Sequence, residues 1–189
     1  MQKFPEKERH GKLSELRKAD QAKKYALAAA ICFAIYTVYK VIEESGYISS
    51  YSTLAILVTI VEIIGYAGLT AAALIRNRKL ALIAAGACFC VKGYLFISYL
   101  SAAFGLLFLA YAALAVIILL SIKGQRLRYF WYIPCLLLLV RWLYITKSFS
   151  FDMGVLLSAD NRLGYLALFV EMAAFLFAGL WLNKESAAT

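Results

Sequence analysis

The chain has 189 residues, of which 63% are hydrophobic, and its mean hydropathy is +0.75. Soluble domains are about half apolar, so this composition excludes an ordinary soluble globular domain and predicts a protein of the lipid bilayer. The formal net charge of +9 arises from 20 lysines and arginines set against 11 acidic residues.

Residues 1–24 form a basic segment, whose helix-forming residues and opposite charges three and four positions apart predict a helix. Residues 25–182 are predicted to be a six-helix transmembrane domain, because apolar runs close to the roughly 20 residues of one crossing recur there. The runs are 25–42, 51–75, 80–100, 104–122, 129–146 and 163–182. The third and fourth are divided at 101–105, where small residues favour a tight turn. Residues 183–189 form a short tail.

The fold class is expected to be all-α. Membrane-spanning strands would show an apolar and polar alternation in segments of about ten residues, and no such alternation occurs. Two prolines in the whole chain also fit helices better than turn-rich strands.

Lysine and arginine are concentrated in alternate connections. They occur in the basic segment, in residues 76–79, in residues 123–128 and at Lys184. The other connections contain few lysines and arginines. The positive-inside rule therefore predicts cytoplasmic N and C termini, with the first span retained rather than cleaved, in the plasma (cytoplasmic) membrane. The basic segment is expected to contact anionic lipids of the inner leaflet. Nucleic acid is not an expected partner, because the segment lacks interleaved aromatic residues.

The residue types for most catalytic or cofactor chemistry are missing from the spans. The single histidine, His10, lies in the basic segment, and no glycine-rich phosphate loop occurs. All four cysteines fall inside spans, which argues against structural disulfides. We therefore expect no enzyme activity, no metal site and no cofactor; an acid dyad of Glu62 with Glu171 is the one catalytic alternative.

Four charged residues stand inside apolar spans at a common depth. Lys92 and Arg141 each lie 12 residues beyond the start of their span at the cytoplasmic border, while Glu62 and Glu171 lie 14 and 13 residues before Arg76 and Lys184. At 1.5 Å per residue, these depths are all about 18 to 21 Å in a hydrocarbon core about 30 Å thick. The four charges are thus predicted to share one layer.

These charges are expected to form two ion pairs. A lone charge near the bilayer centre costs at least about 2.5 to 3.5 kcal/mol, which an oppositely charged neighbour can offset. The second and third spans are joined by a very short loop, so Glu62 is predicted to pair with Lys92. Glu171 with Arg141 is the second predicted pair, although Arg141 in a short span could instead extend towards the interface.

Three tyrosines lie close to this layer in the sequence. Tyr66 is four residues from Glu62, Tyr94 is two residues from Lys92, and Tyr111 is next to the position that matches Glu171 in a neighbouring span. Their hydroxyl groups are therefore expected to line a polar site together with the four charges.

An internal repeat is suggested by a match between residues 106–123 and 167–184, in which Ala110 stands at the place of Glu171. Leucine, phenylalanine and alanine recur at matching positions. The pattern is consistent with three two-helix hairpins, as in transporters built from parallel repeats, but leucine and alanine also repeat by chance.

The first span carries a stripe of small residues four positions apart, made of Ala22, Ala26, Ala30 and Ala34. Such a stripe allows close helix approach, either to another helix of the same chain or to a partner subunit or second copy. In size, helix number and this stripe, the chain resembles the substrate-capturing S subunits of energy-coupling-factor vitamin transporters. The longer outside loops expected over the ligand site of those subunits are missing, and no residue roles are carried over.

The longest outside connection, residues 146–164, contains an apolar piece that can lie in the interface or serve as a lid. Two functions therefore remain open. The buried charges bind or translocate a small charged or zwitterionic solute or an ion, or the chain is a non-catalytic subunit or scaffold that assembles with a partner through its first helix. In the simplest case, the buried pairs only fix helix register.

Overall fold

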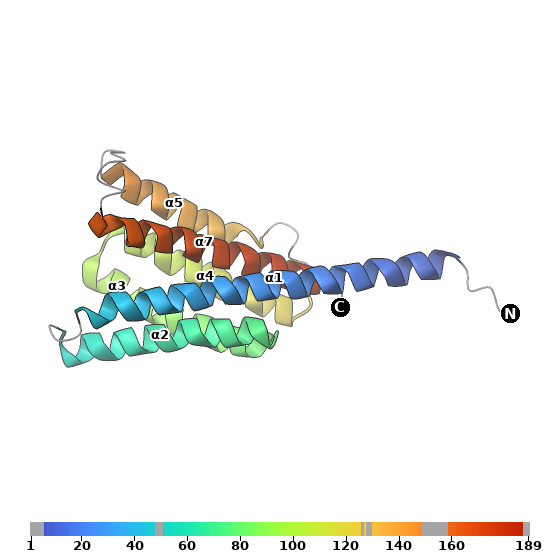
Figure 1. Ribbon diagram of the computed structural model, residues 1–189, viewed down its shortest axis with the longest axis horizontal. Coiled ribbons are helices and arrows are strands. Elements are labelled where there is room, and N and C mark those ends of the chain that lie inside the picture. Colours follow the sequence, from blue (N-terminus) through green and yellow to red (C-terminus); the bar gives the residue numbers. More distant parts are fainter. Residues whose placement is uncertain (1–5, 48–50, 126, 128–129, 149–158, 187–189) are drawn as a thin grey trace.

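The computed structural model describes residues 6–47, 51–125, 127, 130–148 and 159–186. This part of the chain forms six α-helices packed as one bundle (Figure 1). They are α1 (Glu6–Ser45), α2 (Thr53–Leu74), α3 (Arg78–Tyr99), α4 (Ala102–Ile122), α5 (Ile133–Ser148) and α7 (Ala159–Ser186).

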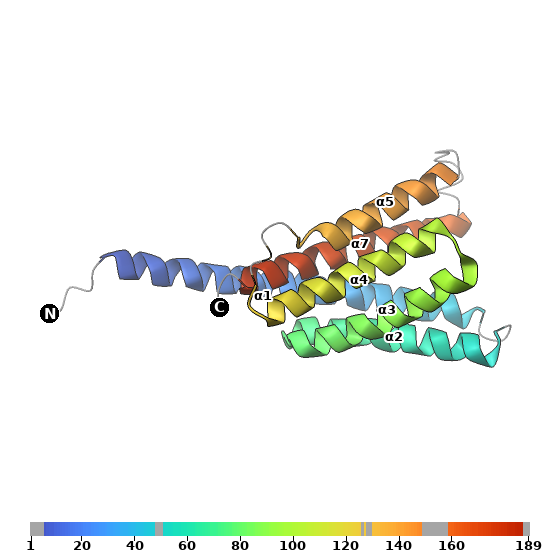
Figure 2. The same cartoon turned by 180° about the vertical axis from the view of Figure 1, so that it is seen from behind.

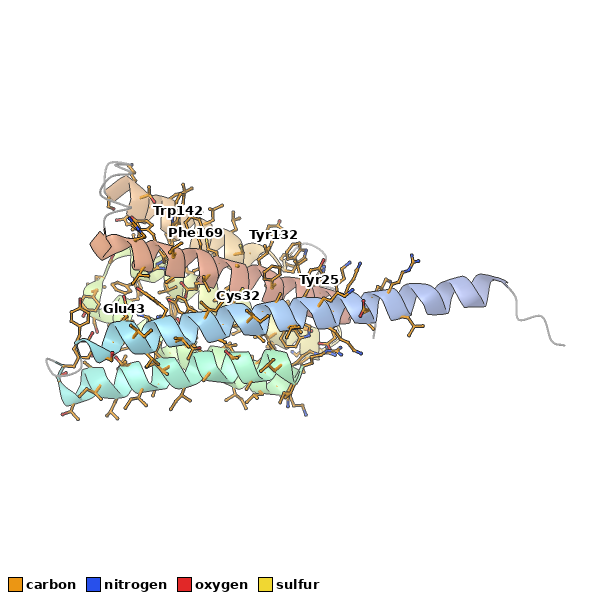
Figure 3. All side chains as sticks on the ribbon, in the orientation of Figure 1. Tyr25, Cys32, Glu43, Tyr132, Trp142 and Phe169 are labelled. Carbon is orange, nitrogen blue, oxygen red and sulfur yellow. The ribbon has the colours of Figure 1, made fainter. Side chains whose placement is uncertain are left out.

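Within the described residues, five segments are long and apolar enough to cross a bilayer: Leu16–Ser45, Thr53–Leu74, Arg78–Tyr99, Ala102–Ile122 and Arg162–Ser186. Large apolar side chains cover the outside of the bundle, as the carbon-rich sticks in Figure 3 show. Ile64, Ile83 and Ile97, for example, are more than half exposed on the bundle surface. An apolar surface of this extent requires a lipid environment, so the chain is an integral membrane protein.

The fifth helix differs from the predicted span 129–146. Helix α5 runs from Ile133 to Ser148 and has only 16 residues, which is about 24 Å of helix against a hydrocarbon core of about 30 Å. Pro134 lies in its first turn. Backbone N–H groups in the first turn have no partner within the helix, so the N–H that proline lacks costs no helical hydrogen bond. Residues 130–132, which the apolar pattern had included in the span, form a turn before the helix.

Helix α1 is continuous over 40 residues. The basic segment therefore runs into the first apolar span without a break, and its first turns project beyond the bundle (Figures 1 and 2). Asp20 and Lys24 form an exposed ion pair of 2.8 Å at i, i+4 along this helix.

The turn between α3 and α4 is tighter than predicted. Leu100 takes a left-handed conformation with φ of 46°, and the next residue, Ser101, accepts a hydrogen bond from the backbone N–H of Ala103. The capped helix then begins at Ala102, so most of the predicted turn 101–105 is helical.

Consecutive helices run in opposite directions and lie side by side (Figures 1 and 2). Helix α1 packs against α2 and α7, α3 lies between α2 and α4, and α5 packs against α4 and α7. Contact between α1 and α7 closes this ring, and α4 also reaches α7. We call the end with residues 76–79, 123–125 and Lys184 the basic end, and the other the opposite end.

The alanine stripe of α1 is used inside the chain. Ala22, Ala26 and Ala30 are buried in the core and Ala34 is half-buried, on a helix whose neighbours are α7 and α2. The small side chains thus allow close packing within the bundle, which is one of the two predicted uses of the stripe, and a contact with a partner subunit stays a prediction.

Most of the predicted outer loop lies outside the described residues, which exclude 149–158. Its flanks belong to helices, with residues 146–148 in α5 and 159–164 in α7. The choice between a lid and an interfacial loop stays a prediction. Cys32, Cys88, Cys90 and Cys135 are free thiols.

Candidate functional site

The four predicted charges meet inside the bundle. Glu62, Lys92 and Glu171 are only 6%, 3% and 1% exposed, and the side chain of Arg141 is 14% exposed. They come from α2, α3, α7 and α5, so the layer joins four of the described helices. Charge is rarely buried in this way unless it is paired.

Glu62 and Lys92 form the predicted ion pair between α2 and α3, in which Lys92 Nζ donates to Glu62 Oε1. The two helices are very close at this level: a Cβ atom added to Gly65 would lie 2.5 Å from Cys88 Sγ. The absent side chain of glycine thus allows the approach that brings the two charges together.

Two tyrosine rings surround the ammonium group of Lys92. Its Nζ atom lies 5.7 Å from the ring centroid of Tyr66 and 6.0 Å from that of Tyr111. Both distances are in the range of a cation–π interaction, which adds to the stabilisation of the buried positive charge.

Glu171 is held by the hydroxyl groups of the same tyrosines. The Tyr111 hydroxyl lies 2.9 Å from Glu171 Oε1 and 2.8 Å from the Tyr66 hydroxyl, which is itself 3.5 Å from Glu171 Oε1. Tyr111 has one hydroxyl hydrogen, so it can donate to the carboxylate while it accepts from Tyr66. The short distances therefore favour a hydrogen-bond chain from Tyr66 through Tyr111 to Glu171.

Arg141 is the second predicted partner of Glu171, and this pair is loose. Arg141 Nη1 lies 3.6 Å from Glu171 Oε2, too long for a hydrogen bond. In the part of the chain that the structure describes, Arg141 Nε and Glu171 Oε2 have no hydrogen-bond partner. Trp142 and Phe169, whose ring centroids are 5.4 Å apart, pack α5 against α7 nearby (Figure 3).

The sequence missed Tyr36 of α1. Its ring lies 4.8 Å from the Tyr66 ring in an edge-to-face arrangement, and it is buried. The sequence does place Tyr36 one helical turn before Lys40, the basic residue of the first span, and this spacing could have indicated that Tyr36 lies near buried charge.

Tyr94 does not belong to the site. Its side chain is 41% exposed on the outside of the bundle, although Lys92, two residues earlier, is buried. Two positions along a helix correspond to about 200° of rotation, so the side chains of residues 92 and 94 point to different sides. Proximity in sequence was the wrong criterion for this residue.

A cleft of about 770 Å³ reaches the charged layer from the opposite end. It lies over α7 with walls from α1 and α5, which flank α7 in Figure 1. Tyr36 and Arg141 of the layer line it, together with Ile35, Val38, Tyr39, Lys40, Ile42, Glu43, Tyr47, Ile145, Leu163, Gly164, Tyr165, Ala167 and Leu168.

The rim of the cleft carries a second ion cluster at the end of α1, where Figure 3 labels Glu43. Lys40 Nζ lies 2.7 Å from Glu43 and 3.3 Å from Glu44. The Tyr39 hydroxyl donates to Glu43 at 2.8 Å, and the Tyr51 hydroxyl donates to Glu44 at the same distance. The hydrogen bond to Glu44 also raises the pKa of Tyr51, which lies outside the spans.

The basic end is tied together by another polar cluster. Arg76 Nη2 lies 2.6 Å from Glu185 Oε1, and Arg78 Nε lies 3.6 Å from Glu185 Oε2. Arg78 Nη1 donates to the backbone carbonyl of Ser121 at 2.6 Å, and the hydroxyl groups of Ser121 and Ser186 are 3.0 Å apart. The α2–α3 loop is thereby linked to the ends of α4 and α7.

The arrangement offers acids, bases and tyrosine hydroxyls at one buried level, next to a cleft. Within the described ranges, no group of three or more His, Cys, Asp or Glu side chains is arranged to hold a metal ion. The groups present can bind and orient charge, and the loose Arg141 pair can exchange its partner.

No protein-family model, curated protein or solved structure matches the chain.

Proposed function

We propose that this protein binds or translocates a small charged or zwitterionic solute, or an ion, at the buried layer of Glu62, Lys92, Arg141 and Glu171. The proposal rests on two features: these four charged side chains lie together inside the bundle, and a cleft from the opposite end reaches one of them, Arg141. A binding site of this kind needs both charged groups and an opening through which a ligand can reach them.

The energetics of the layer support a binding role. Buried ion pairs are weak contributors to stability, and apolar residues of similar volume often serve as well or better. The Glu171–Arg141 pair is separated by 3.6 Å and keeps unpartnered polar atoms on both residues, so it contributes less than a closed pair would. A ligand that supplies the missing acceptor or donor would complete it.

Two rival interpretations lead to different expectations. If the charges only fix helix register, the cleft beside Arg141 has no ligand and the layer can be neutralised without functional loss. The subunit or scaffold interpretation relied on the alanine stripe of α1, and this stripe is buried within the chain. We therefore favour the binding role.

We further propose six crossings in the plasma membrane, with both termini in the cytoplasm. The basic end carries Arg76, Arg78, Lys79, Lys123 and Lys184, which the positive-inside rule assigns to the cytoplasm. Helix α5 is short for a crossing, and local thinning of the bilayer accommodates such a mismatch at a modest cost.

The proposal is tested by ligand-induced stabilisation. The purified full chain in detergent is heated with a panel that contains acetate, glycine, glutamate, lysine, sodium chloride and protons at stepped pH. At least one member should raise the melting temperature of the wild type and have no effect on the double variant Glu62→Gln/Lys92→Met, which removes one acid and one base together. A ligand that stabilises both proteins equally would show that the layer is not its site.

A further inference from the structure

The cleft over α7 contains donor groups that lack acceptors. The Arg141 guanidinium makes one contact of 3.6 Å with Glu171, and its Nε atom is buried without a hydrogen-bond partner among the described residues. The hydroxyl of Tyr165, another residue of the cleft lining, is buried and has Thr146 as its neighbouring polar side chain. Buried donors of this kind normally have partners, so the cleft is built for a molecule that carries acceptor oxygens.

The remaining charges of the lining neutralise each other. Lys40 lies 2.7 Å from Glu43, which also accepts a hydrogen bond from Tyr39. Arg141 is therefore the charge in the lining that has an incomplete partner set, because its contact with Glu171 Oε2 is 3.6 Å long. A guanidinium with free donor capacity can bind a carboxylate or phosphate through two parallel hydrogen bonds.

One wall of the cleft is apolar and faces the lipid. Ile35, Val38 and Ile42 follow one another along α1 at positions i, i+3 and i+7, and they are 52%, 59% and 64% exposed. Leu163 of α7 is exposed at the same end of the cleft. An apolar stripe that leads from a buried arginine to the bilayer suits a molecule with a hydrocarbon part beside its anionic group.

We propose that the ligand is an amphiphile with an oxyanion head group, which enters from the lipid between α1 and α5. Its head group binds Arg141 and Tyr165, and its hydrocarbon chain lies along Ile35, Val38 and Ile42. The inference rests on the proposed function, because it names the ligand class of the same site. A volume of about 770 Å³ is in the usual range for small-molecule sites and holds a head group with part of an acyl chain.

The test uses a fatty-acid probe that carries a photoreactive diazirine on its chain. The full-length protein in phosphatidylcholine nanodiscs is crosslinked, and the labelled peptides are mapped. Crosslinks should concentrate on residues 35–42 of α1. Oleate should compete, whereas methyl oleate, which has the same chain without the charge, should compete at least about tenfold more weakly, since a charge-assisted hydrogen bond is lost.

Two variants examine the head-group and chain contacts separately. Arg141→Gln/Glu171→Gln removes both members of the pair, so no buried charge is left alone, and it should reduce labelling about tenfold or more. Val38→Trp fills the cleft from an exposed position and should abolish labelling of α1. Val116→Trp places the same ring at a similarly exposed valine of α4 and should leave labelling unchanged.

Three outcomes would overturn the inference: labelling spread evenly over the lipid-facing helices, equal competition by methyl oleate, or displacement of the probe by inorganic phosphate alone. If the panel of small solutes shows binding that depends on Glu62 and Lys92 while the probe fails, only the amphiphile is excluded. If the probe succeeds and Glu62→Gln/Lys92→Met leaves its binding unchanged, the cleft site at Arg141 stands and the role proposed for Glu62 and Lys92 is excluded.

Discussion

Glu62 and Lys92 show how a single buried charge depends on its partner. Both side chains are almost completely removed from solvent and lipid, and the ammonium group also faces two tyrosine rings. Either charge without the other would be an uncompensated ion in an apolar bundle, which costs far more than the pair. The pair is therefore a single energetic unit.

We predict that Glu62→Gln lowers the free energy of unfolding by about 3 to 5 kcal/mol, because it leaves Lys92 charged and alone. The double variant Glu62→Gln/Lys92→Met should lose clearly less. Asp20→Asn breaks a fully exposed pair with Lys24 and should leave the free energy of unfolding essentially unchanged. Unfolding in mixed micelles measures all three, and equal losses for the single and double variants would contradict the pairing.

At the scale of helices, close approach between α2 and α3 decides the geometry of the site. Gly65 and Gly68 of α2 face α3, where added Cβ atoms would lie 2.5 Å from Cys88 Sγ and 2.9 Å from Ala84 Cβ. Small residues let the two backbones meet, and dispersion contacts between them replace the hydrophobic driving force that lipid does not provide.

We predict that Gly65→Ala destabilises the bundle by about 1 to 3 kcal/mol, because the new methyl group overlaps Cys88. Adding Cys88→Ala should restore much of the loss, since it removes the overlapping sulfur. Gly86→Ala is the matched control in α3: no atom lies within 4 Å of its added Cβ, so stability should stay level or rise slightly. Thermal unfolding in detergent compares the variants, and a Gly65→Ala protein as stable as wild type would refute close packing here.

The two ends of the helix bundle differ in how tightly their polar groups are linked. The basic end is linked by Arg76, Arg78, Glu185 and Ser121 across three segments. At the opposite end, a cleft is lined by residues of α1, α5 and α7. Under the proposed function, a bundle tied at one end and open at the other would let a ligand reach the charged layer from the opposite end.

We predict that Ser148→Cys and Gly46→Cys react with a membrane-impermeant maleimide from outside intact cells, whereas Lys123→Cys reacts only after permeabilisation. All three positions are exposed next to helix ends. The native cysteines are first replaced by alanine. Labelling of Ser148→Cys together with Lys123→Cys would show that α5 does not cross, and the proposal of six spans would be wrong.

The sequence alone determined the membrane class, the approximate helices and the level of the buried charges. It also predicted both ion pairs, because a charge in a lipid-embedded helix must point towards an opposite charge inside the bundle. The cost of exposing a charge to lipid is high enough to predict from the sequence that Glu62, Lys92, Arg141 and Glu171 point into the bundle.

Which uncharged side chains join these four charges depends on how the helices pack against one another. A helix that is apolar on all sides has no periodic pattern to mark its inner face, because both lipid and core accept the same residues. Tyrosine is tolerated on either face, which is why Tyr94 was wrongly included and Tyr36 was missed. The packing of the alanine stripe inside the chain depends on where α1 meets its neighbours. The cleft beside Arg141 depends on how α1, α5 and α7 meet. Contacts between residues far apart in the sequence determine both.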